Sequence, residues 1–385
     1  MRDSPGGGMS MAIDALRLRI SAADCAAALV LNPINIRYLT GYHSNAYSRP
    51  LTLVVPVYGE PIFLVPRLEA QQARTLTGVQ DVRDYVEWAD GAHAGGAPEA
   101  EWGALLADVL RSTQGRIAVE EAALTPSRAA LLHHVVAHER AVDATGWIDA
   151  MRVIKSPREI DNHRRAAAVA GVGLDAALEA VERAESEREI YAAAFHAMLT
   201  EAARTYPHEP VAVGGNAIVG PRTASLHLPA TGVRPAAGDL AFIVLVASVG
   251  GSWCELSRTV VAGGQASAEQ ARVFRAVARA CDAARACLRP GVTASDVDQA
   301  ARNALAVDDL AAYQPMRTGH GLGMSGGSEA PQLGAADQTP LKVGMVVSIE
   351  PSVCIPGFGG VCWADNFVIT ESGADQLSDY AVVVP

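Results

Sequence analysis

The sequence predicts an α/β protein with two domains, and three observations lead to that prediction. The chain has 385 residues, half of them hydrophobic, which is enough material for two cores. Its first part alternates short apolar runs with helical stretches, as small α/β domains do. Its second part has two helices and two strands, followed by the same order again, which indicates an internal duplication around a curved sheet. We therefore expect a disordered leader over residues 1–12, a first domain over 13–150 and a second over 151–385.

The first domain is expected to contain a hairpin and a further strand of the same sheet. The hairpin is the stretch LTLVVPVYGEPIFLV (51–65), whose centre, Tyr58 to Pro61, has the composition of a turn. The run RIAVEEA (116–122) predicts another strand. The glycine-containing stretch 89–98 is expected to be a surface loop.

Helix starts in the second domain can be recognised from their capping residues. Ser156, Ser186 and Ser267 are each followed three positions later by Glu or Gln, the pattern of a capping box, and Pro157 stands at the first helical position. The helices predicted from these signals begin at Pro157 and span 187–206 and 268–288, and a fourth helix is expected over 293–307.

Composition excludes several classes of partner. The net charge of −11 argues against nucleic acid, whose binding depends on basic patches that neutralise phosphates. No uncharged apolar stretch reaches the roughly 18 residues that a transmembrane helix needs, and the first 12 residues lack the apolar core of a signal peptide. The six cysteines show no CxxC spacing, so we interpret them as reduced thiols of a cytoplasmic protein.

Three ionisable residues interrupt apolar segments of the second domain. Glu255 lies in SWCELSRT, His320 in TGHGLGM and Glu350 in VSIEP. Burying two carboxylates and an imidazole costs several kcal/mol unless something compensates them. These positions therefore predict a functional site.

Motifs along nearly the whole chain resemble the creatinase/prolidase/methionine aminopeptidase (M24) superfamily. NIRYLTGY, FLVPRLEA and MRVIKSPREI are similar to its N-terminal domain and linker, and SLHLP, GDL, SRT, GHGLG, IEP and GGV…DNFVIT follow in the order of its C-terminal domain. The resemblance implies a creatinase-type N-terminal α/β domain and a pita-bread C-terminal domain with a pseudo-twofold duplication. It also implies a homodimer in which a loop of the N-domain lies near the partner's active site.

The resemblance also implies where a metal site would lie, and this chain departs from it. Catalytic members of the superfamily bind two ions through two Asp, one His and two Glu. Those positions correspond here to Val244, Glu255, His320, Glu350 and Ala364, so two of the five ligands are hydrocarbon. Creatinase-like and ectoine-hydrolase-like members work without metal. We therefore expect a degenerate site with no metal and no other cofactor.

Four residues are the expected catalytic groups. His227, in SLHLP, corresponds to the histidine that family members place beside the scissile bond, and it would act as acid or base. Glu255 and Glu350 would bind a cationic group of the substrate, because two nearby carboxylates without a cation repel one another. His320 would hydrogen-bond a carbonyl or carboxylate. The alternatives are a structural loop role for each histidine and a structural ion network for the two glutamates.

Six further residues are expected to contact the substrate. Arg258 and Arg317 could instead pair with the glutamates, and Glu329 stands where the family has a second histidine. Cys362 shares a strand face with Ala364. The last two belong to the loop 42–49, which resembles the N-domain segment that reaches the partner's active site and would suit a lid, or is an ordinary surface loop. These residues are Arg258, Arg317, Glu329, Cys362, Tyr47 and Arg49.

Together these features predict a metal-independent hydrolase that cleaves a C–N bond in a small, cationic, amino-acid-like molecule and that is not a peptidase. The alternatives are an Xaa-Pro-type metallopeptidase with one metal, an enzyme that performs an elimination or cyclisation, and a non-catalytic binding module.

Overall fold

The computed structural model describes residues 6–44, 49–86, 98–378 and 380, which form two compact units. The first unit ends at Arg152 and the second begins at Val153. Apart from residue 98, the expected surface loop 89–98 lies outside the described residues, as does Tyr47. No helix within the described parts is long and apolar enough to cross a membrane.

The expected disordered leader needs a correction, because helix α1 spans Gly6–Ala22 and so includes residues 6–12. Ile13, Leu16 and Ile20 recur at helical spacing and are buried in the core of the first unit. Helix α1 therefore begins within the stretch that we expected to be disordered.

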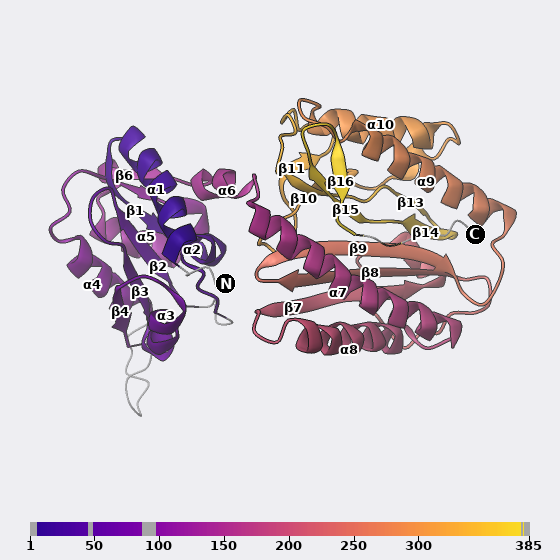
Figure 1. The fold of residues 1–385 in the computed structure, drawn as a ribbon, viewed down its shortest axis with the longest axis horizontal. Coiled ribbons are helices and arrows are strands. Elements are labelled where there is room, and N and C mark those ends of the chain that lie inside the picture. The colour runs from indigo at the N-terminus through magenta and orange to yellow at the C-terminus, as the bar shows by residue number, and fades with distance from the viewer. Residues whose placement is uncertain (1–5, 45–48, 87–97, 379, 381–385) are drawn as a thin grey trace. The chain divides into compact units, whose positions relative to one another are not determined.

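The first unit is built on one six-stranded sheet of order β4-β3-β2-β1-β5-β6 (Figure 1). The predicted hairpin is confirmed as the antiparallel pair β2–β3, with Leu53 opposite Phe63, and the predicted strand after residue 115 is confirmed as β5, parallel to β1. The strands are β1 (Cys25–Val30), β2 (Thr52–Pro56), β3 (Ile62–Pro66), β4 (Asp81–Tyr85), β5 (Arg116–Val119) and β6 (Ala141–Asp143). The helices after α1 are α2 (Pro33–Thr40), α3 (Ala70–Leu76), α4 (Pro98–Leu110), α5 (Pro126–Val135) and α6 (Trp147–Arg152).

Three of the four long helices of the second unit begin at the capping boxes seen in the sequence, and the fourth begins at a further one. Ser156, Ser186 and Ser267 each accept a hydrogen bond from the backbone N–H three residues on, whose side chain bonds back, and Thr293 does the same. The helices are α7 (Pro157–Glu182), α8 (Glu187–Thr205), α9 (Ala268–Cys287) and α10 (Ala294–Ala306).

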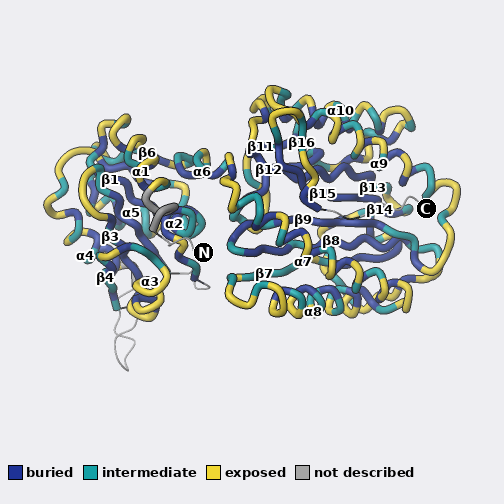
Figure 2. Tube along the Cα trace, viewed as in Figure 1, coloured by how far each residue is buried: buried dark blue, intermediate teal, exposed yellow. Residues whose placement is uncertain are grey.

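Each helix pair is followed by strands, which confirms the predicted pita-bread duplication. The first half is the sheet β7-β8-β9, and the second contains the sheet β11-β10-β12-β15-β16 and the hairpin β13-β14. The strands are β7 (Val211–Val219), β8 (Leu240–Val249), β9 (Ser252–Val261), β10 (Gly319–Gly321), β11 (Glu329–Leu333), β12 (Val346–Ile349), β13 (Ser352–Ile355), β14 (Gly359–Cys362), β15 (Asp365–Ile369) and β16 (Ala374–Gln376). Two apolar clusters fill the space between helices and sheets, α7 and α8 over the first half and α9 and α10 over the second, so the strands are buried while the outer helix faces are exposed (Figure 2).

The two halves meet where β9 passes β15. Ser257 and Ala364 exchange backbone hydrogen bonds of 3.3 and 3.2 Å. Two residues further along, the Asn366 amide donates to the Glu255 carbonyl at 2.6 Å and accepts from the Glu255 N–H at 3.1 Å. This seam holds Glu255, from the first half, against the second half.

The carboxylate of Glu187, fully buried at the start of α8, ties this helix to β7 and to the loop that carries His227. It accepts hydrogen bonds from the Val219 N–H, from the N–H and hydroxyl of Thr231, and from the Arg222 guanidinium. Burial alone would raise the pKa of Glu187, but these hydrogen bonds outweigh it and lower the pKa.

We expect Glu187→Ala to lower the free energy of unfolding by about 3 kcal/mol or more, because it leaves several buried donors and a cation without their acceptor. Urea denaturation would measure this. Glu201→Ala, on the same helix, is the control, because among the described residues Glu201 bonds to Arg204 and Thr205 alone; it should change stability by about 0.5 kcal/mol at most. Equal effects of the two changes would contradict the role given to Glu187.

Candidate metal centre and active site

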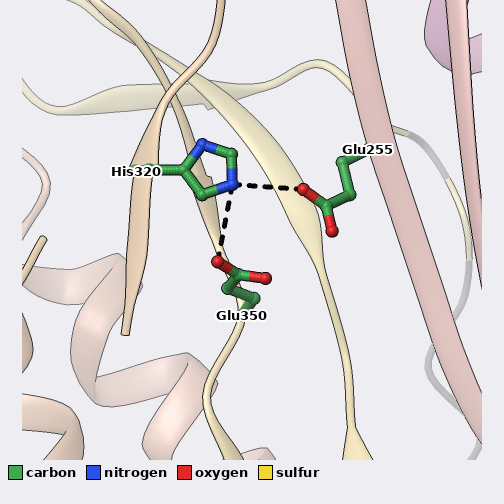
Figure 3. A group of neighbouring side chains, drawn as sticks. All are labelled: Glu255, His320 and Glu350. Carbon is green, nitrogen blue, oxygen red and sulfur yellow. Dashed lines mark hydrogen bonds and ion pairs between the residues drawn. The ribbon is translucent and has the colours of Figure 1, made fainter. Parts of the chain in front are cut away.

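Glu255, His320 and Glu350 converge inside the second unit from three different strands (Figure 3). Glu255 lies on β9, His320 on β10, and Glu350 directly after β12. The His320 Nε2 atom is 3.2 Å from Glu255 Oε2 and 3.5 Å from Glu350 Oε1, and one donor atom from each residue lies within 4.8 Å of the others. The structure therefore brings together three of the four predicted catalytic residues.

The backbone around His320 explains this convergence. A Cβ at Gly319 would clash with the Ser348 carbonyl of β12, and one at Gly321 with the Ala330 carbonyl of β11, so glycine on both sides lets β10 lie between these strands. The Glu350 N–H donates to the Thr318 carbonyl at 2.6 Å, which fixes Glu350 beside the strand of His320.

The hydrogen bond of the other ring nitrogen sets what His320 can bind. Its Nδ1 lies 2.9 Å from the Gly321 carbonyl, which only accepts, so Nδ1 carries the proton and donates. In neutral His320 the Nε2 lone pair then faces two carboxylate oxygens. Three electron-rich atoms at such distances repel unless a proton or a metal ion lies between them.

The pKa values of Glu350 and His320 reflect the same repulsion between donor atoms. Burial and the charge of Glu255 raise the pKa of Glu350 to about 7, although the positive charges of His320 and Arg317 oppose this. Burial lowers the pKa of His320, but its hydrogen bond to Glu255 and the negative charge of Glu350 outweigh burial, so the pKa is raised. Without a metal ion, this group therefore holds a proton near neutral pH.

This donor set suits one metal ion. Metal–nitrogen and metal–oxygen distances of about 2.0–2.2 Å place neighbouring donors of a tetrahedral ion about 3.3–3.6 Å apart. The separations of 3.2 and 3.5 Å around His320 Nε2 match that spacing. One imidazole and two carboxylates leave coordination positions open, as in catalytic sites.

The donor set does not suit a second ion. Val244, on β8, packs in an apolar cluster with Ile218, Phe242 and Cys362, and Ala364 is fully buried. Neither side chain has an atom that can bind a metal, so the space of the two missing ligands is apolar.

His227 lies outside this group. It is exposed and lines a cavity of about 470 Å³ whose other walls include Leu226, Leu228 and Met316. The apolar cluster around Leu226 also contains Cys362, whose thiol lies 3.9 Å from the Glu350 carbonyl. None of the three donor residues lines this cavity, and the apolar cluster of Leu226 and Cys362 is what connects the cavity to the segment of Glu350.

Arg258 is placed away from both glutamates. Its guanidinium pairs with Asp365 at 3.0 Å, donates to the carbonyls of Ser257, Ala364 and Tyr380, and lies over the Tyr380 ring. Its contacts with Ala364 and Asp365 support the seam between the halves. The ion network that we considered for Arg258 exists, but with Asp365 rather than with Glu255 or Glu350.

The other expected contact residues are dispersed. Glu329, on β11, accepts a hydrogen bond from the Ser325 N–H. Burial raises the pKa of the Cys362 thiol well above its usual value, and the thiol lies 3.8 Å from the Ser257 hydroxyl. Arg49 belongs to the first unit and Tyr47 lies outside the described residues. The homodimer that would bring their loop to a partner's site stays a prediction.

Our sequence reasoning missed two residues that hold the site in place. Asn366 bonds both backbone atoms of Glu255, and its place after Asp365 in a matched motif was the available signal. Asp298, buried on α10, accepts from the N–H and hydroxyl of Thr318 at 3.0 and 2.7 Å. Nothing in the helical pattern around Asp298 points to that contact.

We expect chelator-treated protein to lose stability as pH rises, because the native state holds protons that the unfolded chain releases. Glu350 titrates near 4.5 when unfolded and near 7 when folded, so its contribution is present below pH 4.5 and is lost on the way to pH 7. The raised pKa of His320 acts in the same direction. Urea unfolding at pH 5 and pH 8 should show a smaller loss in Glu350→Gln than in the wild type, whereas replacing exposed Glu371 by Gln should leave the loss unchanged. Equal losses in wild type and Glu350→Gln would refute this.

Comparison with known proteins places this geometry in a family. The model of metallopeptidase family M24 matches residues 161–371, more than half of the chain. The chain belongs to the M24 family. The Creatinase/Prolidase N-terminal domain model matches residues 13–154, which confirms both parts of the predicted fold.

Relatives and solved structures of this M24 chain include several dipeptidases. It is 30% identical to a probable dipeptidase PepE of Mycobacterium tuberculosis over 395 aligned positions, covering 96% of each chain. It is 28% identical to the putative dipeptidase YkvY of Bacillus subtilis over 361 residues, covering 92% of this chain and 93% of the relative. The crystal structure of dipeptidase PepE from Mycobacterium ulcerans superposes with a TM-score of 0.79 at 28% identity, covering 99% and 98% of the two chains. An Xaa-Pro dipeptidase from Bacillus anthracis shares the fold, with a TM-score of 0.83 at 21% identity and coverage of 98% and 99%.

These findings overturn the expected function. The prediction of a metal-independent C–N hydrolase outside the peptidases is wrong, because the M24 relatives are described as dipeptidases and a metal-type donor group is present. The physical reason is that the five family ligands are not all needed to bind one ion. Val244 and Ala364 remove the donors of a two-ion site, but Glu255, His320 and Glu350 still converge on a single point.

Proposed function

We propose that this M24 chain is a metal-dependent dipeptidase whose active site holds one ion. The observation that carries the proposal is the convergence of three donor atoms from Glu255, His320 and Glu350 within 4.8 Å, with separations of 3.2 and 3.5 Å from the histidine nitrogen that match a coordination shell. The dipeptidases among its relatives support the reaction class. This is the one-metal alternative considered from the sequence.

Each residue of the site has a distinct part in this reaction. A bound ion would polarise the peptide carbonyl and make a hydroxide available from water near neutral pH. Glu255 and Glu350 balance a divalent charge, and His320 is held in the right tautomer by the Gly321 carbonyl. His227, exposed at the wall of the adjoining cavity, would donate a proton to the departing amine.

The cavity favours a substrate with an apolar side chain. Leu226, Leu228, Pro315 and Met316 are four of its eight lining residues, and about 470 Å³ is room for one large side chain with part of the peptide backbone. We therefore propose dipeptides with an apolar residue as the preferred substrates.

Metal content and hydrolysis of a panel of apolar dipeptides, measured on one preparation, test this proposal. Purification without chelator should give about one equivalent of manganese, iron, cobalt or zinc, the number that a single donor set can hold. Hydrolysis should stop on chelation and return when that metal is added back. Hydrolysis by the metal-free protein, or no hydrolysis of any dipeptide by the loaded protein, would refute the proposal.

A double variant tests whether the two missing ligands are the whole difference between this site and a two-ion site. Val244→Asp combined with Ala364→Glu supplies the missing carboxylates and should raise the stoichiometry from about one ion to about two, since paired carboxylates can bridge two dications. Calorimetric titration with manganese measures this. If the variant still binds one ion, residues around the ligands must differ as well.

A further inference from the structure

A small cavity of the first unit lies where three neighbouring strands end. Strands β1, β5 and β6 are adjacent and parallel in the sheet, so their carboxyl ends lie at the same edge. The cavity is lined by residues from the segments that follow these strands: Asn32 and Asn35 after β1, Glu120, Ala122 and Ala123 after β5, and Thr145, Gly146 and Asp149 after β6. In α/β sheets, ligands bind outside the carboxyl ends of parallel strands.

The size of this cavity limits what it can hold. Its volume is about 80 Å³. Sites for organic ligands usually have volumes of about 300–1,000 Å³, so a metabolite would not fit. A single metal ion with one or two waters would fit.

Asn35 has a buried amide oxygen without a donor. The side chain is 1% exposed, and its Nδ2 atom donates to Glu120 Oε1 at 2.6 Å. A carboxylate can only accept, so the NH₂ group of Asn35 must face Glu120 and its oxygen must point away from that carboxylate. No residue that the structure describes donates to this oxygen. A buried amide oxygen needs a partner, which a cation can supply.

Glu120 carries a negative charge that no described cation balances. It is 5% exposed and accepts hydrogen bonds from the N–H groups of Leu31 and Asn32 at 2.7 and 2.8 Å. All its hydrogen bonds within the described part of the chain come from uncharged groups. The other carboxylate of the cavity, that of Asp149, pairs with Arg152 at 2.9 Å. One buried negative charge therefore remains to be compensated.

We propose that Asn35, Glu120 and Asp149 form a binding site for a monovalent metal cation, sodium or potassium. The donor atoms are all oxygens, which hard cations prefer. A single positive charge balances Glu120, whereas a divalent ion would leave an excess of positive charge beside Arg152. The bound ion joins the three segments that follow β1, β5 and β6.

Hydrogen–deuterium exchange of the full chain tests this proposal in sodium chloride, potassium chloride and choline chloride at equal ionic strength. The choline cation is too large for the cavity and shows the effect of salt alone. Sodium or potassium should slow exchange in the peptide that covers residues 31–40, because the ion fixes Asn35 and also Glu120, which bonds to the amides at the start of this peptide. The more effective salt identifies the ion, and its titration gives an apparent dissociation constant. Peptides of the second unit should not respond.

Two variants and one matched control locate the ion. Asp149→Asn should raise the apparent dissociation constant at least about tenfold, since even residues that only orient a metal ligand change affinity by that much. Asp108→Asn is the control: Asp108 is exposed to a similar extent and pairs with Arg111 three residues on, but it does not line the cavity. Glu120→Gln keeps the size of the side chain and should abolish the response. If that variant does not fold, Asp149→Asn decides.

Three results would overturn the proposal. Equal exchange in all three salts would mean that water or a proton satisfies Asn35 and Glu120. A response to calcium chloride but to neither monovalent salt would contradict the balance of a single charge. Equal dissociation constants for Asp149→Asn and Asp108→Asn would place the ion elsewhere. Because the measurement follows the first unit, none of these results depends on whether the protein hydrolyses dipeptides.

Discussion

Replacing His320 by alanine is expected to remove ion binding and dipeptide hydrolysis together. Its Nε2 atom lies next to both carboxylates. Without His320, the site has two carboxylates of like charge and no nitrogen donor. Even residues that only orient a ligand change metal affinity by about 10–100-fold, so loss of a ligand should cost more than about 100-fold. Calorimetry with the native metal and a hydrolysis assay measure the two effects.

His196→Ala is the matched control for this change, because His196 is an exposed histidine on α8 of the same unit. It should keep one equivalent of metal and full activity. A His320→Ala protein that still binds one equivalent tightly would mean that the ion is held elsewhere, and the proposed centre would be wrong.

His227→Ala should reduce turnover by about 10²–10⁴-fold while the metal content stays at one equivalent. The reason is that His227 lies outside the donor group but lines the cavity beside it, so its loss removes a proton donor and not a ligand. Steady-state kinetics should show the decrease mainly in kcat, with a smaller change in KM. An unchanged kcat would mean that His227 only packs against the cavity wall and takes no part in proton transfer. A loss of bound metal would mean that His227 affects the reaction by helping to hold the ion.

Local features of the fold could be predicted from the sequence because their causes are local. Each capping box needs only a residue pair three positions apart, and Ser156, Ser186 and Ser267 all cap helices as expected. The hairpin between Leu51 and Val65 follows from two apolar runs and a turn. The order of the family motifs then predicted the architecture of both units.

The site could be predicted only in part, because its chemistry depends on distances between strands. The sequence shows that Val244 and Ala364 cannot bind a metal, and from this we expected a degenerate site without metal, with a one-metal peptidase as the alternative. It does not show that the remaining donor atoms lie within 4.8 Å of one another, which depends on the packing of β9, β10 and β12. In the same way, the sequence could not show that Arg258 pairs with Asp365 rather than with Glu255, because that pairing depends on how the two halves meet.

Glu255 lies on one half of the duplication, and His320 and Glu350 lie on the other. Binding of a metal ion by all three would therefore stabilise the association of the two halves. An ion held by all three would act as a removable cross-link between the halves, in addition to the hydrogen bonds of Ser257 and Asn366. Any opening of the seam would divide the donor set and release the ion. Conversely, an ion present at about a thousand times its dissociation constant would oppose that opening by about 4 kcal/mol. Neither half can build the centre alone, so the bound ion would report whether the two are assembled.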